Sequence, residues 1–264
     1  MRYSLTSPLF SIAIVFLASG SPTLAAARPN GTEAGNLSGY AQTGSAYTSV
    51  SAKWHVPGVT FGAVISFTSN LQWIGINGLS GETGVIQGGT GQDIAGDSGV
   101  VSYYGWYANA AGGVQTIPAD RYPVEPGDVM AASLSCSADC TPGERATWLF
   151  VLQDLTRNWT FNQTLRIRSE MKSAEVIEEA TSDGNGHTFP WPDYGMITFT
   201  DVTTNGVRQN LARSQPLYSS DVTGTSNPSN PNGAGNGFTV CWGPPGEFAD
   251  CPVTALPDTP GGAN

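Results

Sequence analysis

The stretch Ser49-Val50-Ser51-Ala52-Lys53-Trp54-His55-Val56-Pro57 alternates between polar and apolar side chains. Successive side chains of a β-strand point to opposite faces, so the two valines, the alanine and the tryptophan share one face. Pro57 cannot donate a hydrogen bond to a neighbouring strand and ends the run. The stretch therefore predicts a β-strand that buries one face.

Short runs of the same kind follow along the chain, separated by residues that favour turns. We expect strands near residues 61–67, 70–77, 83–88, 100–108, 128–135, 146–154, 158–168, 173–181 and 195–203. This spacing is typical of a β-sandwich or barrel. Residues 214–237 are rich in Ser, Asn, Pro and Gly, which predicts a long loop.

The composition supports an all-β chain with a sizeable core. Of 264 residues, 39% are hydrophobic and only 12% are charged. Lys53 and Lys172 are the only lysines, so surface helices built on Glu–Lys pairs are disfavoured. The net charge of −10 and the pI of about 4.4 remove the basic surface that nucleic acid or an anionic membrane needs. We expect neither as a partner.

The first 27 residues predict a signal peptide, because an apolar run from Leu9 to Ala18 is followed by small residues before Arg28. That run is too short to span a bilayer. We expect a secreted, extracellular protein with one domain over residues 28–253 and a flexible tail over 254–264. Sequons that permit N-glycosylation start at Asn30, Asn36, Asn158 and Asn162.

Four cysteines in an exported chain favour two disulfides. Three pairings are possible, and we expect Cys136 with Cys140 and Cys241 with Cys251, because each of these pairs flanks a turn. A zinc site is the alternative. Two histidines in the whole chain and the lack of a Cys-x-x-Cys spacing argue against it.

The segment Gly96-Asp97-Ser98-Gly99 resembles the surroundings of a protease nucleophile, and His55 could supply a base. His55 precedes the serine by only 43 residues and lacks the setting of a trypsin-like base. An aspartic protease needs a second Asp-Thr/Ser-Gly, which the sequence lacks. We interpret the segment as a glycine-rich turn between strands.

Two regions retain candidate chemistry. One contains Gln72–Gly78 followed by Val85–Gly89, and the other is Ser173–Thr181. On a strand, Glu175 and Glu179 of the second region share a face with an isoleucine. A carboxylate beside apolar side chains is a candidate for a raised pKa, and the alternative is an ordinary solvated face.

Six motifs occur in order along nearly the whole chain after the signal peptide. They are Val-Ser-Ala-Lys-Trp-His-Val-Pro (50–57), Trp-Ile-Gly-Ile-Asn-Gly (73–78), Ile-Gln-Gly-Gly (86–89), Gly-Trp-Tyr (105–107), Ala-Glu-Val-Ile-Glu-Glu (174–179) and Phe-Thr-Asp-Val…Asn-Gly (199–206). The set resembles the glutamic peptidases of family G1, the eqolisins. The resemblance implies a sandwich of two curved antiparallel sheets, of the concanavalin A-like or jelly-roll type, with the active site on the concave face.

The resemblance also implies the catalytic residues. Gln87 and Glu179 match the family's dyad, which leaves Glu178 out. A carboxylate at Glu179, ionised in mild acid, would take a proton from a water molecule and return it to the leaving amine. The Gln87 amide would orient the water and stabilise the oxyanion. No cofactor or metal is implied, and we expect a monomer that acts on proteins or peptides.

Trp73 and Trp106 match family positions that line the cleft, and ordinary core positions are the alternative for both. Three positions depart from the family pattern. An aspartate is replaced by Asn77, which we still expect to contact substrate, an acidic residue by Ala108, and a tryptophan by Leu37. These departures predict a shifted specificity and pH optimum, with an inactive relative as the alternative.

Two other classes of function stay open from the sequence. Glycoside hydrolases on similar sandwiches place several carboxylates along one strand, but Glu175 and Glu179 would lie about 13 Å apart on an ideal strand, beyond the spacing that reaction uses. Ile177 also stands where that motif has a carboxylate. A lectin-like binding module is the third class, because aromatic residues on a curved sheet would suit it.

Overall fold

The computed structural model describes residues 31–253 except positions 45, 80, 110–112 and 184. The predicted signal peptide and C-terminal tail lie outside the described residues. The described strands are β1 (Thr32–Glu33), β2 (Leu37–Thr43), β3 (Ser49–His55), β4 (Thr68–Ile76), β5 (Ile86–Ile94), β6 (Val101–Asn109), β7 (Gly113–Thr116), β8 (Val129–Ala138), β9 (Arg145–Asp154), β10 (Trp159–Arg168), β11 (Ser173–Ala180), β12 (Met196–Thr204), β13 (Val207–Arg208), β14 (Gln215–Ser220), β15 (Thr225–Pro228) and β16 (Phe238–Gly243). Within the described ranges one short 3-10 helix, Leu211–Arg213, is the only helical element, and none could cross a membrane.

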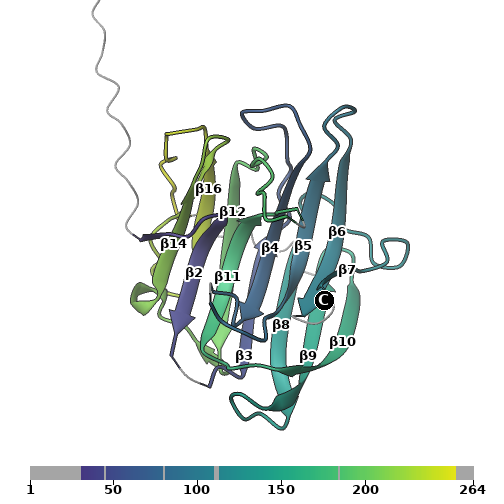
Figure 1. The fold of residues 1–264 in the computed structure, drawn as a ribbon, viewed down its shortest axis with the longest axis vertical. Coiled ribbons are helices and arrows are strands. Elements are labelled where there is room, and N and C mark those ends of the chain that lie inside the picture. The colour runs from purple at the N-terminus through teal and green to yellow at the C-terminus, as the bar shows by residue number, and fades with distance from the viewer. Residues whose placement is uncertain (1–30, 45, 80, 110–112, 184, 254–264) are drawn as a thin grey trace, which may run out of the picture.

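The strands form two stacked layers (Figure 1). One layer has the order β14-β2-β11-β4-β5-β6-β7, and the other has the order β10-β9-β8-β3-β12-β16-β15. β14 pairs with both β2 and β15, so the two layers are one continuous sheet folded over at this strand. Apart from the parallel pair β1–β14, the pairings are antiparallel. The predicted all-β sandwich is confirmed, with its layers hydrogen-bonded along one side.

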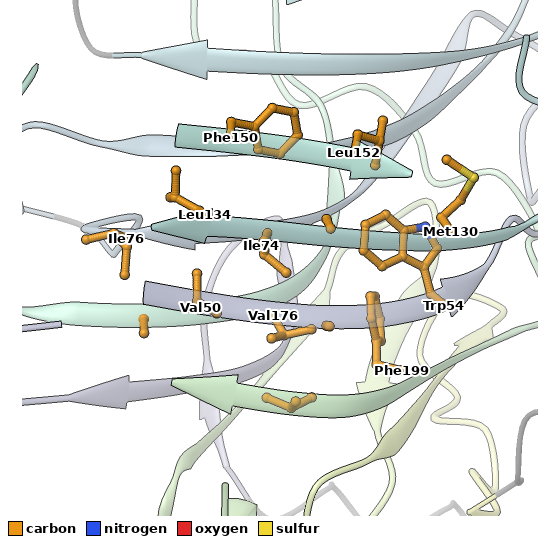
Figure 2. Close-up of a cluster of buried hydrophobic side chains, with 14 of the residues drawn as sticks. Val50, Trp54, Ile74, Ile76, Met130, Leu134, Phe150, Leu152, Val176 and Phe199 are labelled. Carbon is orange, nitrogen blue, oxygen red and sulfur yellow. The ribbon is translucent and has the colours of Figure 1, made fainter. Parts of the chain in front are cut away.

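The hydrophobic core lies between the layers (Figure 2). β3 alternates between buried and partly buried side chains, as its sequence predicts, and Val50 and Trp54 point into the core. Phe199 packs against the Trp54 ring with the ring centres 5.9 Å apart. Ile74 and Val176, which lie on the opposite layer, belong to the same cluster of buried side chains. Each such burial stabilises the fold by roughly 1.5–3 kcal/mol.

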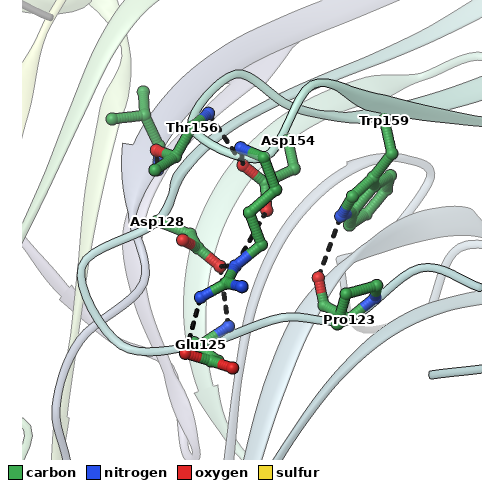
Figure 3. A network of polar contacts seen from close by, with 8 residues as sticks. Pro123, Glu125, Asp128, Asp154, Thr156 and Trp159 are labelled. Carbon is green, nitrogen blue, oxygen red and sulfur yellow. Dashed lines mark hydrogen bonds and ion pairs between the residues drawn. The ribbon is translucent and has the colours of Figure 1, made fainter. Parts of the chain in front are cut away.

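A network around Arg157 ties the β9–β10 turn to the loop before β8 (Figure 3). Arg157 Nε donates to Asp128 Oδ2 over 2.8 Å, and Nη2 donates to Glu125 Oε2 over 2.5 Å. Asp154 Oδ1 accepts hydrogen bonds from the backbone N–H groups of Thr156 and Arg157. The network anchors one end of the layer that carries β8, β9 and β10.

Two local predictions are wrong. Residues 61–67 form no strand, and Ile65 there is 79% exposed, because the apolar run has no neighbouring strand to pair with beyond a single bridge at Thr60. Residues 214–237 contain β14 and β15 in place of one long loop. These strands are polar in sequence, but they lie where the layers join, so their side chains are mostly buried regardless of composition.

Both disulfides occur in the predicted local pairing. Cys136 at the end of β8 is bonded to Cys140 in the following turn. Cys241 of β16 is bonded to Cys251, which holds the segment after β16 against its own strand. No free cysteine remains among the described residues.

Candidate active site

β11 has two chemically different faces. It lies between β2 and β4, and its Val176 and Ala180 belong to the core between the layers. Ile177 points the other way, into a second apolar cluster with Trp73 and Trp106 on the outer face of this layer. Because strand side chains alternate, Glu179 shares this outer face, while Glu178 points into the core.

The Glu179 carboxyl is partly buried and held at both oxygens. Asn36 Nδ2 donates to Oε1 over 3.0 Å, and Trp73 Nε1 donates to Oε2 over 2.8 Å. Burial raises the pKa of Glu179 to about 7, although the hydrogen bonds from Trp73 and Asn36 act in the opposite direction. Neither donor can titrate near neutral pH, so the carboxyl is the proton-exchanging group of the three.

Gln87 lies near the start of β5, opposite Gly75 of β4 and Ala108 of β6. Its side chain has no hydrogen bond to any other described residue, so the amide is available to a ligand. The next residues of β5 are glycines because neighbours come close: a Cβ on Gly89 would overlap the carbonyl oxygen of Gln72. A Cβ on Gly88 would likewise overlap the Phe150 ring, so both glycines of the run allow close packing around β5.

Gln87 and Glu179 line the same groove, which has a volume of about 750 Å³. Trp73 and Asn36 lie in its wall, with apolar contributions that include Leu79 and Leu217. The two predicted catalytic side chains, far apart in sequence, are therefore brought to one hollow on the outer face of the layer. A groove of this size falls within the range of about 300–1,000 Å³ that is usual for ligand-binding clefts.

The two predicted cleft tryptophans differ in position. Trp73 lines the groove and donates to Glu179 while its ring is buried in the second apolar cluster. Trp106 is fully buried in that cluster, and its Nε1 donates to the carbonyl oxygen of Thr90 over 3.0 Å. Trp106 thus belongs to the same apolar cluster as Trp73 but does not line the groove, and its contact with a substrate stays a prediction.

Asn77 is buried and holds the loop 77–85, whose residues Gly78, Leu79 and Val85 line the groove. Its Nδ2 donates to the Thr83 carbonyl over 2.6 Å, and its Oδ1 accepts from the Lys172 N–H over 2.6 Å. An ionised aspartate could not make the first of these bonds. The asparagine at this position is therefore explained by the loop, and its contact with substrate stays a prediction.

Glu175 is fully buried at the other end of β11, beneath the loop 77–85. A Cβ on Gly78 would lie 3.1 Å from its Oε2, so this glycine lets the loop approach closely. Burial raises the pKa of Glu175 to about 8, and the nearby Glu82 carboxylate acts in the same direction. Glu175 does not line the groove.

Glu178 lies in a polar network inside the core. Asn70 Nδ2 donates to its Oε1 over 2.6 Å, and Gln72 Nε2 donates to its Oε2 over 2.7 Å. Gln72 continues the network to Gln92 and Thr90 on β5. Burial raises the pKa of Glu178 well above its usual value, despite these donors. The network lies between the layers and does not reach the groove.

The other sequence candidates do not assemble a site. Ser98 lies in the turn between β5 and β6, which Gly99 closes with a positive φ of 66° and an N–H bonded to the Ala95 carbonyl. This confirms a glycine-rich turn. Over the described ranges, no three His, Cys, Asp or Glu side chains gather in a way that could hold a metal ion.

Sequence reasoning missed Asn36 as a member of the site. Local sequence could not show its contact with Glu179, because that contact joins residues 143 positions apart. The network of Glu178 with Asn70 and Gln72 was missed for the same reason, since it joins three segments of the chain. The motif Asn36-Leu37-Ser38-Gly39 was the available signal for Asn36, since it matches the family pattern at the asparagine and departs from it only at Leu37.

Comparisons with known proteins agree with this fold. A model described as the Peptidase A4 family matches residues 35–226. A crystal structure of scytalido-glutamic peptidase with a peptide-based transition-state analogue is 22% identical, with a TM-score of 0.60 over 80% of this chain and 100% of that one. SCP-B, an eqolisin in complex with the tripeptide Ala-Ile-His, is 22% identical, with a TM-score of 0.57 over 80% and 100%.

Aspergilloglutamic peptidase from Aspergillus niger is 21% identical, with a TM-score of 0.50 over 66% of this chain and 98% of that one. At these identities the solved structures establish a shared fold. A comparison with curated protein sequences gave no match.

Proposed function

This chain belongs to the Peptidase A4 family, whose members are glutamic peptidases that hydrolyse proteins or peptides, and on that premise we propose that it is a secreted acid endopeptidase with Gln87 and Glu179 as its catalytic dyad. The observation that carries the proposal is the shared groove. Gln87 and Glu179 both line it, and the Glu179 carboxyl is fixed by two donors that do not titrate. Secretion rests on the predicted signal peptide and on the two disulfides.

The protonation state of Glu179 refines the mechanism expected from the sequence. With a pKa of about 7, the carboxyl of the free enzyme carries a proton in mild acid, where the sequence predicts an ionised carboxylate. A neutral carboxyl can both donate and accept, since one oxygen bears the proton and the other has a free lone pair. We therefore assign both transfers of the reaction to the protonated form of Glu179.

In the first step, water adds to the carbonyl carbon of the scissile bond. The Glu179 O–H gives its proton to the carbonyl oxygen while the other carboxyl oxygen takes a proton from the water. The product is a neutral gem-diol, and the carboxyl is again protonated. The Gln87 amide oxygen orients the water, and its N–H stabilises the charge that develops on the carbonyl oxygen.

In the second step, the C–N bond breaks. Glu179 gives its proton to the departing nitrogen and takes one from a hydroxyl of the gem-diol, so the products are a carboxylic acid and an amine. Gln87 carries no charge at any pH in this range. The pair therefore avoids the repulsion between two carboxylates that aspartic proteases must manage.

The glycosidase alternative is less well supported. Of the three glutamates on β11, only Glu179 lines the groove, because Glu175 lies under a loop and Glu178 lies in the core. A glycosidase needs a second carboxyl at a defined distance from the first. Among the described residues, the other carboxyl that lines the groove is Glu33, which is exposed to solvent on the two-residue strand β1. A lectin-like module would give no reason for a carboxyl held in this way.

The test is an assay of the purified protein on a denatured protein substrate between about pH 2 and 5. We expect cleavage that resists pepstatin-type inhibitors and is unchanged by EDTA. Failure to cleave in that range would contradict the enzymatic proposal, and inhibition by EDTA would contradict its metal-free chemistry.

A further inference from the structure

Asn36, in the turn between β1 and β2, grips the end of β11 at three points. Its Nδ2 donates to Glu179 Oε1 over 3.0 Å and to the Ala180 carbonyl over 2.7 Å. Its own carbonyl accepts the Ala180 N–H over 3.0 Å. Both hydrogens of the amide are therefore used, one on the carboxyl of Glu179 and one on the backbone that follows it.

This geometry fixes the carboxyl without sharing its chemistry. The backbone bonds lock Asn36 to β11, so its donor to Oε1 has little freedom to turn away. Trp73 holds Oε2 from the other side. Because each oxygen accepts one fixed hydrogen bond, the plane of the carboxyl is set. Each oxygen keeps one further lone pair or a proton that can interact with a molecule bound in the groove.

Asn36 also begins the sequon Asn36-Leu37-Ser38. A glycan on this residue would be attached to Nδ2, the atom that donates to Glu179. The attached sugar would also stand in the groove that Asn36 lines. The sequence thus carries a modification signal at a position where the modification and the geometry exclude each other.

We propose that Asn36 is a positioning residue for Glu179, and that its sequon must remain free of glycan in active protein. This inference rests on the proposed function of Glu179. Asn36 acts through the carboxyl, so its loss should alter how Glu179 works more than how tightly substrate binds.

The surroundings of Glu179 contain few other groups that could alter its titration. Glu178 precedes it on the opposite face of β11, and Glu33 of β1 lines the groove. The facing residues of β2 and β4, Leu37 and Leu71, carry no charge. A change in the pH profile after substitution of Asn36 can therefore be assigned to the lost hydrogen bond.

The experiment compares three variants of the full chain by kcat, KM and pH profile. Asn36→Ala should lower kcat at least about tenfold with a smaller change in KM. It should also move the upper limb of the profile to higher pH by about one pH unit, because a donor that favours the ionised carboxyl is lost. Asn36→Asp keeps the shape but places a second carboxyl beside the first, and should move the limb further.

Ser38→Ala is the matched control. It removes the sequon and leaves Asn36 in place, and the buried Ser38 Oγ has no hydrogen-bond partner among the described residues. We expect its activity and profile to equal those of the unmodified protein. Made in a glycosylating host, protein with a glycan at Asn36 should be inactive, and the Ser38→Ala protein should be uniformly active.

The outcomes separate this inference from the proposed function. An unchanged pH limb in folded Asn36→Ala, or in the isosteric Asn36→Asp should the alanine variant not fold, overturns the positioning role. A glycan found on Asn36 of active protein overturns the second part. An active Glu179→Gln protein, by contrast, would remove the dyad itself, whatever the Asn36 variants do.

Discussion

The indole Nε1 of Trp73 lies 2.8 Å from Oε2 of Glu179, and this hydrogen bond crosses from β4 to β11. The Trp73 ring is almost fully buried against Ile177, the residue opposite it on β11. A large apolar body thus carries a polar donor to a fixed point at the wall of the groove. One side chain both lowers the exposure of the carboxyl and offsets part of the resulting rise in its pKa.

Trp73→Phe is therefore expected to weaken catalysis while the fold persists. Phenylalanine keeps most of the apolar contact but cannot donate to Oε2. We expect kcat to fall about tenfold and the upper limb of the pH profile to move up by about one pH unit, since a hydrogen bond to the ionised form is lost. Near-ultraviolet circular dichroism checks the packing. An unchanged profile would show that the indole N–H has no part in setting the carboxyl.

Glu179→Gln and its neighbour Glu178→Gln form a matched pair. Glutamine at 179 can no longer exchange a proton, so kcat should fall by the roughly 10² to 10⁴ typical of a lost acid–base group. Glutamine at 178 should leave kcat nearly intact. If the Asn70 amide flips, its Oδ1 faces residue 178 and can accept a hydrogen bond from the new glutamine NH₂. That oxygen is free to do so, because it has no partner among the described residues.

Single-turnover and steady-state rates on one peptide measure both variants. More than about a tenth of the original kcat in Glu179→Gln would contradict the mechanism. Sensitivity of Glu178 instead would mean that the catalytic carboxyl had been assigned to the wrong face of β11.

Gln87→Ala removes the amide that we assign to the developing oxyanion. A lost donor of this type costs roughly 10² to 10³ in rate. The space it leaves opens onto the groove, so little loss of stability is expected. The measurement is kcat beside the melting temperature, and a protein with full kcat and an unchanged melting temperature would exclude Gln87 from the chemistry.

The fold was most predictable where one face of a strand is buried. The alternation around Trp54 predicted β3, and the alternation of β11 separated Glu178 from Glu179. The alternation of apolar side chains did not predict β14 and β15, where Ser219 and Thr225 are buried because two layers join there. Hydrophobic patterning cannot reveal a strand whose partners, rather than its side chains, decide its position.

Gln87 and Glu179 could be proposed as the catalytic pair only through the family motifs. The partners of Glu179 could not be read from local sequence. Asn36 and Trp73 reach it from two other strands or turns, across 143 and 106 positions. Such contacts depend on sheet register, which a single sequence fixes only weakly.

Stability is expected to fall as the pH rises. Burial raises the pKa of Glu175 to about 8 and the pKa of Glu178 well above its usual value. An acid whose pKa is higher in the folded state binds more protons folded than unfolded, so its contribution is complete below about pH 4.5 and is lost toward pH 8. A tenfold change in the acid dissociation constant between the folded and unfolded states corresponds to about 1.4 kcal/mol in the free energy of unfolding.

Thermal melts from pH 4 to 8 measure this dependence. We expect the melting temperature to be highest near pH 4 and to decline through the neutral range. Glu178→Gln, which cannot ionise, should make the decline shallower. A melting temperature that rises toward neutral pH would contradict the assignment of these buried carboxyls as neutral acids.

The pH dependence of kcat/KM tests the protonation state on which the mechanism rests. With the pKa of Glu179 at about 7, the protonated carboxyl predominates below pH 6. If that form is the active one, kcat/KM on a small peptide should be level in mild acid and fall about tenfold per pH unit above 7. Samples held at high pH and returned to pH 4 must recover full activity, because unfolding could otherwise imitate the decline. A kcat/KM that instead rises with pH to a plateau near 7 would mean that the ionised carboxylate attacks as a base. The two mechanisms use the same atoms and give opposite slopes, so the sign of the slope decides between them.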